Sequence, residues 1–384
     1  MVYPGSPLSR RDALAVAGAS LAAVAALPGV ARAADAQDSA PRFAPEPDAE
    51  LTVRHLAAQR VIFSYPGATV PQSLLDLIAA GLVGGVILYG ENISSLPQIT
   101  AAVAQMREAN ASSPVRAPLL VMTDQEGGKV RRLPGGPVQT AKQIGASPDP
   151  GPAAAGAGRE AGLLLRSAGL NVNLAPVLDV FRTPGDFEDQ YQRSFSMDPA
   201  VVATCGTAFI AAQQETGVAA TAKHFPGLGP ASAKQNTDNG PVTLTTSLSD
   251  LRSIDEQPYI PAIAANLALV MMSWAVYTAL DPNYPAGLSS KIIRRELRDR
   301  LGFEGVTISD AINAGALAAF GTPPQNAVKA ANAGMDLILE STRDISHGQA
   351  VVDALTAALA DGTLDVPESD AALRRIMKLR RELQ

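Results

Sequence analysis

Cysteine, histidine and tryptophan are scarce in this chain of 384 residues, which contains one cysteine, three histidines and one tryptophan. The single cysteine, Cys205, excludes an internal disulfide and a cysteine-rich metal site. With only His55, His224 and His347 available, a zinc site would need carboxylates from several parts of the chain, so we expect neither a metal nor a cofactor. The formal net charge of -6, without a dense stripe of lysine and arginine, argues against a nucleic-acid partner.

Long hydrophobic runs are also missing, except near the N-terminus. Arg10 and Arg11 precede an alanine-rich apolar run over residues 13–27, and a small-residue cleavage pattern follows it. This order predicts an export signal peptide of the twin-arginine type over residues 1–33, which would carry the protein to the periplasm, the cell wall or the medium. A retained membrane anchor is the alternative, but the run is shorter than the roughly 20 residues that a membrane-spanning helix needs.

A segment rich in proline, alanine and aspartate at residues 34–50 predicts a flexible linker before a folded domain at residues 51–384. In this domain short, continuously apolar runs alternate with longer amphipathic stretches, a pattern typical of parallel strands that helices cover on both faces. We therefore expect an α/β fold with a single (β/α)8 barrel. A doubly wound sheet is the alternative, although no Gly-x-Gly-x-x-Gly follows the first strand. The expected strands are residues 61–64, 85–89, 119–123, 172–175, 219–222, 269–273, 305–309 and 336–339.

Charged side chains follow several of these strands, at the end of a barrel where active sites are built. Asp124 comes directly after the third strand, and Arg193 lies in the loop that follows the fourth. Lys223 and His224 end the fifth strand, and Asp310 follows the seventh. Side chains of these types offer both hydrogen-bond acceptors and charge-assisted donors, which suits a ligand rich in hydroxyl groups.

Two of these aspartates also have a structural interpretation. Asp310 can act as a nucleophile, because nearby lysine and arginine side chains would keep its carboxylate ionised. It can equally cap a helix that begins at Ala311. Asp124 can bind a sugar hydroxyl or close its own strand in an Asx turn. Position alone does not choose between these roles.

Four motifs resemble those of glycoside hydrolase family 3, most closely its single-domain β-N-acetylglucosaminidase branch. The resemblance runs in the family's order from about residue 55 to residue 345. It implies that Asp310 matches the nucleophile that forms a glycosyl-enzyme, in a reaction that retains the anomeric configuration. It also implies that Asp124, Arg132, Arg193, Lys223 and His224 match the positions that hold the terminal N-acetylglucosamine. The motifs are Asp124-Gln125-Glu126-Gly127-Gly128 with Arg132, Arg193-Ser194-Phe195, Lys223-His224-Phe225-Pro226-Gly227 and Ser309-Asp310.

The loop after the fifth strand departs from the family pattern. In the hexosaminidase branch this loop carries an Asp-His pair that supplies the acid/base, whereas residues 228–240 of this chain contain no histidine. Asp238 is the acid/base that we expect on this loop. The alternatives are Glu340 or Glu126, or an enzyme that is slow or inactive. General acid catalysis contributes on the order of 100- to 10,000-fold, so losing it slows turnover without abolishing sugar binding.

The expected function is therefore an exo-acting hydrolase that removes terminal β-linked N-acetylglucosamine from cell-wall fragments or chitin-type oligosaccharides. A catalytically impaired sugar- or muropeptide-binding protein is one alternative, and another family 3 exo-glycosidase, such as a β-glucosidase, is the second. Trp274, after the sixth strand, either stacks on a sugar face or caps the barrel core. His55 and His347 lie outside the matched motifs, and we interpret them as structural or solvated.

Overall fold

The structure is a computed structural model that describes residues 51–383. The predicted signal peptide at residues 1–33 and the predicted linker at residues 34–50 lie outside the described residues. Within the described part of the chain, no helix has both the length and the apolar character to cross a membrane.

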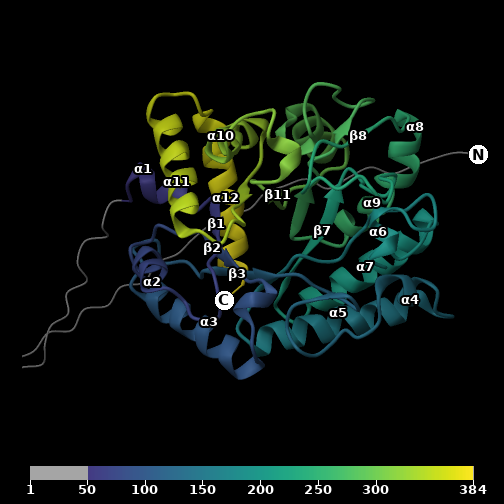
Figure 1. Cartoon of the computed structure of the whole chain (residues 1–384), viewed down its shortest axis with the longest axis horizontal. Helices are drawn as coiled ribbons and strands as arrows, with labels where there is room; N and C mark the ends of the chain where they lie inside the picture. The colour runs from purple at the N-terminus through teal and green to yellow at the C-terminus, as the bar shows by residue number, and fades with distance from the viewer. Residues whose placement is uncertain (1–50, 384) are drawn as a thin grey trace, which may run out of the picture. The chain divides into compact units, whose positions relative to one another are not determined.

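Eight parallel strands close into a barrel in the order β1-β12-β11-β9-β7-β6-β3-β2, which confirms the predicted single (β/α)8 domain (Figure 1). Val, Ile, Leu and Met fill the barrel interior, and a second apolar cluster packs between the barrel and its helices. Because both faces of each strand are covered, the strands have the continuous apolar character seen in the sequence. The barrel strands are β1 (Val61–Phe63), β2 (Gly85–Ile87), β3 (Leu120–Thr123), β6 (Val172–Asn173), β7 (Ala219–Phe225), β9 (Leu269–Met272), β11 (Val306–Ala311) and β12 (Leu337–Leu339).

Helices surround the barrel, and local sequence signals mark their ends. Ser95 caps the first turn of α3, and Thr322 forms a capping box at the start of α10. Gly334 ends α10 in the left-handed conformation, which glycine adopts without a steric penalty. The helices are α1 (Val53–Ala58), α2 (Gln72–Ala79), α3 (Leu96–Ala111), α4 (Ala141–Gly145), α5 (Pro150–Ser167), α6 (Phe187–Gln190), α7 (Pro199–Gln214), α8 (Leu248–Asp250), α9 (Tyr259–Ala264), α10 (Pro323–Ala333), α11 (Ile345–Ala360) and α12 (Val366–Glu382).

Shorter elements sit on the loops that join the barrel strands and helices. Strands β4 (Gln125–Gly127) and β5 (Val130–Arg131) form an antiparallel hairpin, while β8 (Thr243–Leu244) pairs with β10 (Val276–Tyr277). Short helical segments on the loops are η1 (Gly90–Asn92), η2 (Leu251–Asp255), η3 (Ala286–Leu288) and η5 (Gly315–Leu317). The longer segment η4 (Lys291–Arg300) lies between β9 and β11 in the chain.

Two barrel strands reach further than the sequence predicts. Strand β7 extends to Phe225, beyond the apolar run at residues 219–222, so it includes Lys223 and His224 as expected and continues past them. Strand β11 likewise includes Asp310. No helix begins at Ala311, whose amide donates to Asp310 Oδ1 at 2.7 Å, and the next helical turn is η5. The helix-cap interpretation of Asp310 is therefore wrong, because its carboxylate lies at the end of a strand.

Candidate active site

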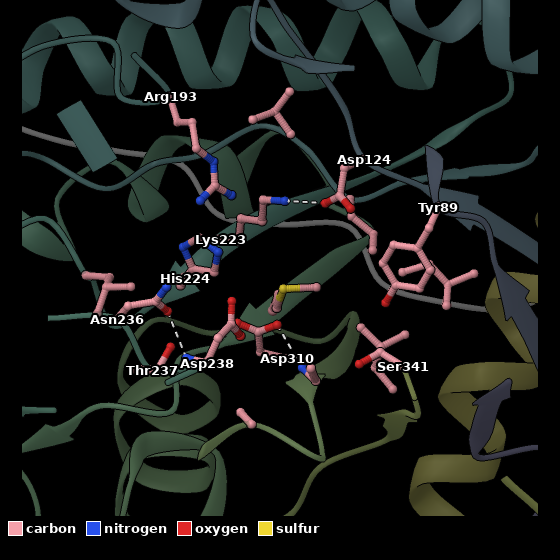
Figure 2. Close-up of a pocket in the computed structure, with 18 of the residues that line it drawn as sticks. Tyr89, Asp124, Arg193, Lys223, His224, Asn236, Thr237, Asp238, Asp310 and Ser341 are labelled. Carbon is pink, nitrogen blue, oxygen red and sulfur yellow. Dashed lines mark hydrogen bonds and ion pairs between the residues drawn. The ribbon is translucent and has the colours of Figure 1, made fainter. Parts of the chain in front are cut away.

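A cavity of about 510 Å³ opens where the carboxyl ends of the barrel strands meet. Strands β3, β7 and β11 and the loops after β6 and β7 bring the predicted site residues to this one place. Figure 2 shows Lys223 and His224 near its centre, with Asp310 and Asp238 side by side below them. The predicted residues that line the cavity are Asp124, Arg132, Arg193, Lys223, His224, Asp238 and Asp310.

Lys223 binds two carboxylates at the base of the cavity. Its Nζ lies 2.7 Å from Asp124 Oδ1 and 2.7 Å from Glu126 Oε1. Asp124 is therefore held by a cation across the barrel, which favours the ligand-binding interpretation over a local turn. Burial lowers the pKa of Lys223, but the two carboxylates more than offset this and raise it, so the ammonium stays charged.

Glu126 joins Lys223 to Arg193. The Arg193 guanidinium donates to both of its oxygens, from Nε at 2.9 Å and from Nη2 at 2.7 Å. Burial favours the neutral carboxyl, but Arg193 and Lys223 hold the pKa of Glu126 well below its usual range. Glu126 therefore stays ionised and aligns the two cations, and it does not line the cavity. This arrangement disfavours Glu126 as the acid/base.

Glu340, the other alternative acid/base, is also turned away from the cavity. Its carboxylate accepts a hydrogen bond from Ser64 Oγ at 3.1 Å and another from the Thr342 amide at 2.7 Å. Burial raises the pKa of this group, and the hydrogen bonds from Thr342 and Ser64 only partly oppose the shift. Glu340 thus ties the loop after β12 to the end of β1.

His224 is oriented by Asp179, which follows β6. Its Nδ1 lies 2.7 Å from Asp179 Oδ2, and its backbone amide donates to Asp179 Oδ1 at 3.2 Å. The amide of Leu228 also donates to Asp179 Oδ1, at 2.6 Å. Burial lowers the pKa of His224, but the carboxylate of Asp179 raises it overall. Asp179 therefore fixes both the imidazole and the start of the loop that carries Asp238.

Glu188, at α6, is a buried cavity-lining carboxyl that the sequence did not reveal. It pairs with Arg193 Nη1 at 2.9 Å and lies 3.7 Å from His224 Nδ1. Burial raises its pKa, and Arg193 and His224 offset only part of this shift. Potential ligand atoms of Asp179, Glu188 and His224 lie within 4.8 Å of one another. Asp179 and His224 are hydrogen-bonded to each other, and Glu188 is paired with the Arg193 guanidinium. The cluster therefore orients Arg193 and His224.

Asp238, on the loop after β7, and Asp310, at the end of β11, face the same part of the cavity (Figure 2). The Asp238 amide donates to Asn236 Oδ1 at 2.8 Å, which holds the turn that presents its carboxyl. Asp238 is exposed to solvent at the mouth of the cavity. Partial burial of its carboxyl among the cavity walls, followed by the negative charge of Asp310, raises its pKa. A carboxyl whose pKa is raised by burial and by a neighbouring carboxylate is suited to acid catalysis.

The opposite wall consists of Tyr89, Ser341 and Arg343. The Arg343 guanidinium carbon lies 4.3 Å from the centre of the Tyr89 ring, and Ser341 donates to Asn313 Oδ1 at 2.7 Å. Arg132 lines the cavity too, and within residues 51–383 its guanidinium has no ion-pair partner. The wall therefore offers a ligand both an aromatic hydroxyl and free hydrogen-bond donors.

Three residues left open by the sequence lie outside the cavity lining. Trp274 is buried, and its Nε1 donates to the Ala311 carbonyl at 2.9 Å, so it supports the backbone next to Asp310 and does not stack on a ligand. His55 belongs to the capping box of α1 and contacts the Ala80 carbonyl, while His347 contacts Thr342 near the start of α11. His55 thus has a structural role at the start of α1, and His347 is exposed to solvent.

Replacing Lys223 by methionine tests the ion-pair network at the base of the cavity. The variant leaves Asp124 without its cation and Glu126 with only Arg193, so we expect a loss of roughly 3 kcal/mol in the free energy of unfolding at neutral pH. The pKa of Glu126 is lower in the folded protein than in the unfolded chain. The stabilisation that the network gives is therefore fully present above the pKa of the unfolded carboxyl and is lost as the pH falls below about 4. Denaturant unfolding at several pH values measures it.

Lys378→Met is the matched control, because Lys378 is 74% exposed on α12 and makes only a 4.0 Å ion pair with Glu382. We expect its unfolding free energy to stay within about 0.5 kcal/mol of the unaltered protein. Equal losses in the two lysine variants, or a Lys223 loss that does not change with pH, would contradict the network.

Comparison with known proteins identifies the family of this chain. The model of the glycosyl hydrolase family 3 N-terminal domain matches residues 53–379. A protein of Arthroderma benhamiae named an uncharacterized secreted glycosyl hydrolase is 47% identical over 328 residues, which is 85% of this chain and 93% of that protein. A beta-hexosaminidase of Stenotrophomonas maltophilia is 35% identical over 73% of this chain and 82% of its own length.

Solved structures give the same result. A family 3 beta-N-acetylglucosaminidase from Paenibacillus superposes with a TM-score of 0.81 at 32% identity over 87% of this chain, which spans only 63% of that enzyme. A beta-N-acetylhexosaminidase from Beutenbergia cavernae has a TM-score of 0.79 at 33% identity, and the match covers 86% of this chain and 99% of that structure. The carboxyl ends of the barrel strands also place paired carboxylates and cations in one cavity. This chain therefore belongs to glycoside hydrolase family 3 and is a glycoside hydrolase.

Proposed function

We propose that this glycoside hydrolase removes terminal β-linked N-acetylglucosamine from oligosaccharides, with retention of the anomeric configuration. The observation that carries the proposal is the pairing of Asp310 and Asp238 at one cavity, beside a cluster of buried polar side chains suited to a single sugar ring. Relatives named beta-hexosaminidase, at about 35% identity, support the choice of sugar.

Asp310 is the nucleophile in this proposal. Its Oδ1 accepts the amide proton of Ala311, which fixes the carboxylate and leaves the second oxygen for attack on the anomeric carbon. The bond from that carbon to the glycosidic oxygen breaks as the bond to Asp310 forms, and a covalent glycosyl-enzyme results. Trp274 supports this geometry through its hydrogen bond to the Ala311 carbonyl.

Asp238 is the acid and then the base. It gives its proton to the glycosidic oxygen of the leaving group, and its carboxylate afterwards takes a proton from the water that releases the sugar from Asp310. Its raised pKa favours the protonated form that the first step needs. The exposure of Asp238 at the cavity mouth gives it access to the leaving group and to water.

The remaining cavity residues bind the sugar. Asp124 accepts hydrogen bonds from hydroxyl groups, while Lys223, Arg193 and Arg132 donate to hydroxyl oxygens. His224 is a further donor, and the contact between its Nδ1 and Asp179 holds the imidazole in place. Because most of these groups are already paired with one another, the binding surface is organised before the sugar arrives, which lowers the entropic cost of binding.

The alkaline side of the pH–rate profile tests the role of Asp238. Because partial burial and Asp310 raise its pKa, kcat/KM for an unactivated substrate should fall only above the ordinary carboxyl range, as Asp238 loses its proton. His224 and Arg193 also face this carboxyl and oppose the shift, and Asp124 adds to it. Asp238→Asn should remove this limb of the profile. An unchanged alkaline limb in the variant would assign the titration to another group, such as His224.

We further propose that residues 1–33 export the protein and that its substrates are cell-wall fragments or chitin-type oligosaccharides outside the cytoplasm. The Arthroderma relative that is named secreted supports this location. Deleting residues 1–33 should leave the protein inside the cell, as measured by immunoblotting of cell fractions. Replacing Arg10 and Arg11 by lysine should have the same effect if the signal is of the twin-arginine type.

Hydrolysis assays with purified protein test the activity itself. We expect turnover of both 4-nitrophenyl N-acetyl-β-glucosaminide and an unactivated N-acetylglucosamine disaccharide, with little turnover of the matching glucoside. Binding of N-acetylglucosamine without turnover of either glycoside would leave the catalytically impaired binding protein, and preference for the glucoside would leave a β-glucosidase.

A further inference from the structure

The loop that carries Asp238 is joined by its backbone to the segment that follows Asp310. The Gly315 amide donates to the Asp238 carbonyl at 2.8 Å, and the Ala316 amide donates to the Thr237 carbonyl at 3.0 Å. Both donors lie in η5, which follows β11 after residues 312–314. The residue that presents the proposed acid is thus tied to the chain segment that presents the proposed nucleophile.

This contact depends on the absence of a side chain at residue 315. A Cβ added to Gly315 would lie 2.7 Å from the backbone carbonyl carbon and oxygen of Asn239 and 2.8 Å from the Asp238 carbonyl oxygen. Such distances are shorter than van der Waals contact, and all the atoms concerned are backbone, so the two segments would have to separate. The φ angle of Gly315 is not in the left-handed region, so the requirement is for close approach and not for an unusual backbone conformation.

The other end of the loop is anchored independently. The Leu228 amide donates to Asp179, and the Phe187 amide donates to the Ala231 carbonyl at 3.0 Å. Near Asp238 the turn is closed internally, by the amides of Asn239 and Gly240, which donate to the Asn236 carbonyl. After the turn, β8 pairs with β10, and the Val276 amide donates to the Val242 carbonyl at 2.9 Å. The contact with η5 links the Asp238 turn directly to the segment that follows β11.

We propose that Gly315 is a positioning residue that sets the distance between Asp238 and Asp310 by allowing η5 to pack against the Asp238 backbone. It touches neither substrate nor the reacting atoms and acts through Asp238. This inference rests on the proposed function, because it assigns to Gly315 the placement of the proposed acid. The loop at residues 228–240 has no histidine. In this proposal the backbone of η5, on the segment that follows the nucleophile's strand, positions Asp238.

The Gly315→Ala variant tests the proposal when its rates are measured with two substrates whose leaving groups differ in how much protonation they need. Misplacing a catalytic group by about 1 Å costs on the order of 100-fold, so kcat for the unactivated disaccharide should fall roughly 10- to 100-fold. A dinitrophenyl glycoside needs little protonation of its leaving group, so cleavage of its glycosidic bond in a single turnover should change less than about 3-fold. A merely structural role would lower both values together.

Gly240→Ala is the matched control. Gly240 lies in the same loop, two residues after Asp238, and nothing lies within 4 Å of a Cβ added there. We expect its kinetics with both substrates to equal those of the unaltered enzyme. The double variant Asp238→Ala with Gly315→Ala should be no slower on the disaccharide than Asp238→Ala alone, since a positioning residue has no effect once the group it positions is gone.

The outcomes separate the two proposals. If the unaltered protein hydrolyses neither N-acetylglucosaminide, the proposed function fails. If it does, and Gly315→Ala matches Gly240→Ala or slows both substrates equally, the positioning role alone is wrong. If Gly315→Ala does not fold, hydrogen exchange of the unaltered protein decides: the Gly315 and Ala316 amides should be protected, and exchange as fast as in an open loop would overturn the proposal.

Discussion

Asp310→Ala should lower kcat/KM for every N-acetylglucosaminide by about 10,000-fold or more, because losing the nucleophile removes the covalent route entirely. The loss should be as large for an activated aryl glycoside as for a disaccharide, since both need the attack on the anomeric carbon. Thermal unfolding should show a folded protein, because Asp310 lies at the cavity surface and, among the residues that the structure describes, its carboxylate accepts a hydrogen bond from the Ala311 amide alone.

Glu304→Gln is the control for this variant. Glu304 is exposed at the other end of the same strand, just before β11 begins, and it is far from the catalytic chemistry along the barrel. Its kinetics should equal those of the unaltered enzyme. If Asp310→Ala retained more than about one hundredth of the activity, a different carboxylate would have to be the nucleophile.

Asp238→Ala should separate substrates by how much protonation their leaving groups need. For an unactivated disaccharide, kcat should fall by about 100- to 10,000-fold, the usual contribution of a general acid. For a dinitrophenyl glycoside the glycosylation step should be almost unchanged, while release of the sugar slows because water has lost its base. A burst of dinitrophenol followed by slow turnover is the expected signature, and stopped-flow absorbance measures it.

Azide provides the second readout for Asp238. This small anion attacks a glycosyl-enzyme without needing a general base, so it should accelerate turnover of the dinitrophenyl glycoside by Asp238→Ala and yield a β-glycosyl azide. The unaltered enzyme should not respond. Equal losses on both substrates without azide rescue would mean that Asp238 has a structural role and that a different group is the acid. Glu188, whose pKa burial also raises, would then be the next carboxyl to test among the described residues that line the cavity.

The barrel and the position of the site follow from sequence features that are local. Continuous apolar runs indicate parallel strands, and charged residues at their carboxyl ends indicate the mouth of a barrel. Asp124, Lys223 and Asp310 could be predicted to meet because each follows or ends such a run, and they do line one cavity. Asp179 carries the same signal after β6, and its partnership with His224 could have been predicted in the same way.

Other parts of the site depend on contacts between segments that no local pattern relates. Glu188 lies in a short helix of the loop after β6, and only the folded barrel brings it within 3.7 Å of His224. The close approach of Gly315 to Asp238 is likewise a packing event between two loops. Strand ends are similarly difficult, because β7 and β11 continue through residues whose polarity suggests that the strand has already stopped.

Trapping the glycosyl-enzyme tests the central claim most directly. A 5-fluoro N-acetylglucosaminyl fluoride forms the covalent intermediate quickly and releases it slowly, so that intact mass spectrometry and peptide mapping can locate the sugar. The account predicts a single adduct on Asp310, and a β-configured product in the early NMR spectrum of a normal turnover. An adduct on another residue, or turnover that gives the α-anomer first, would contradict it.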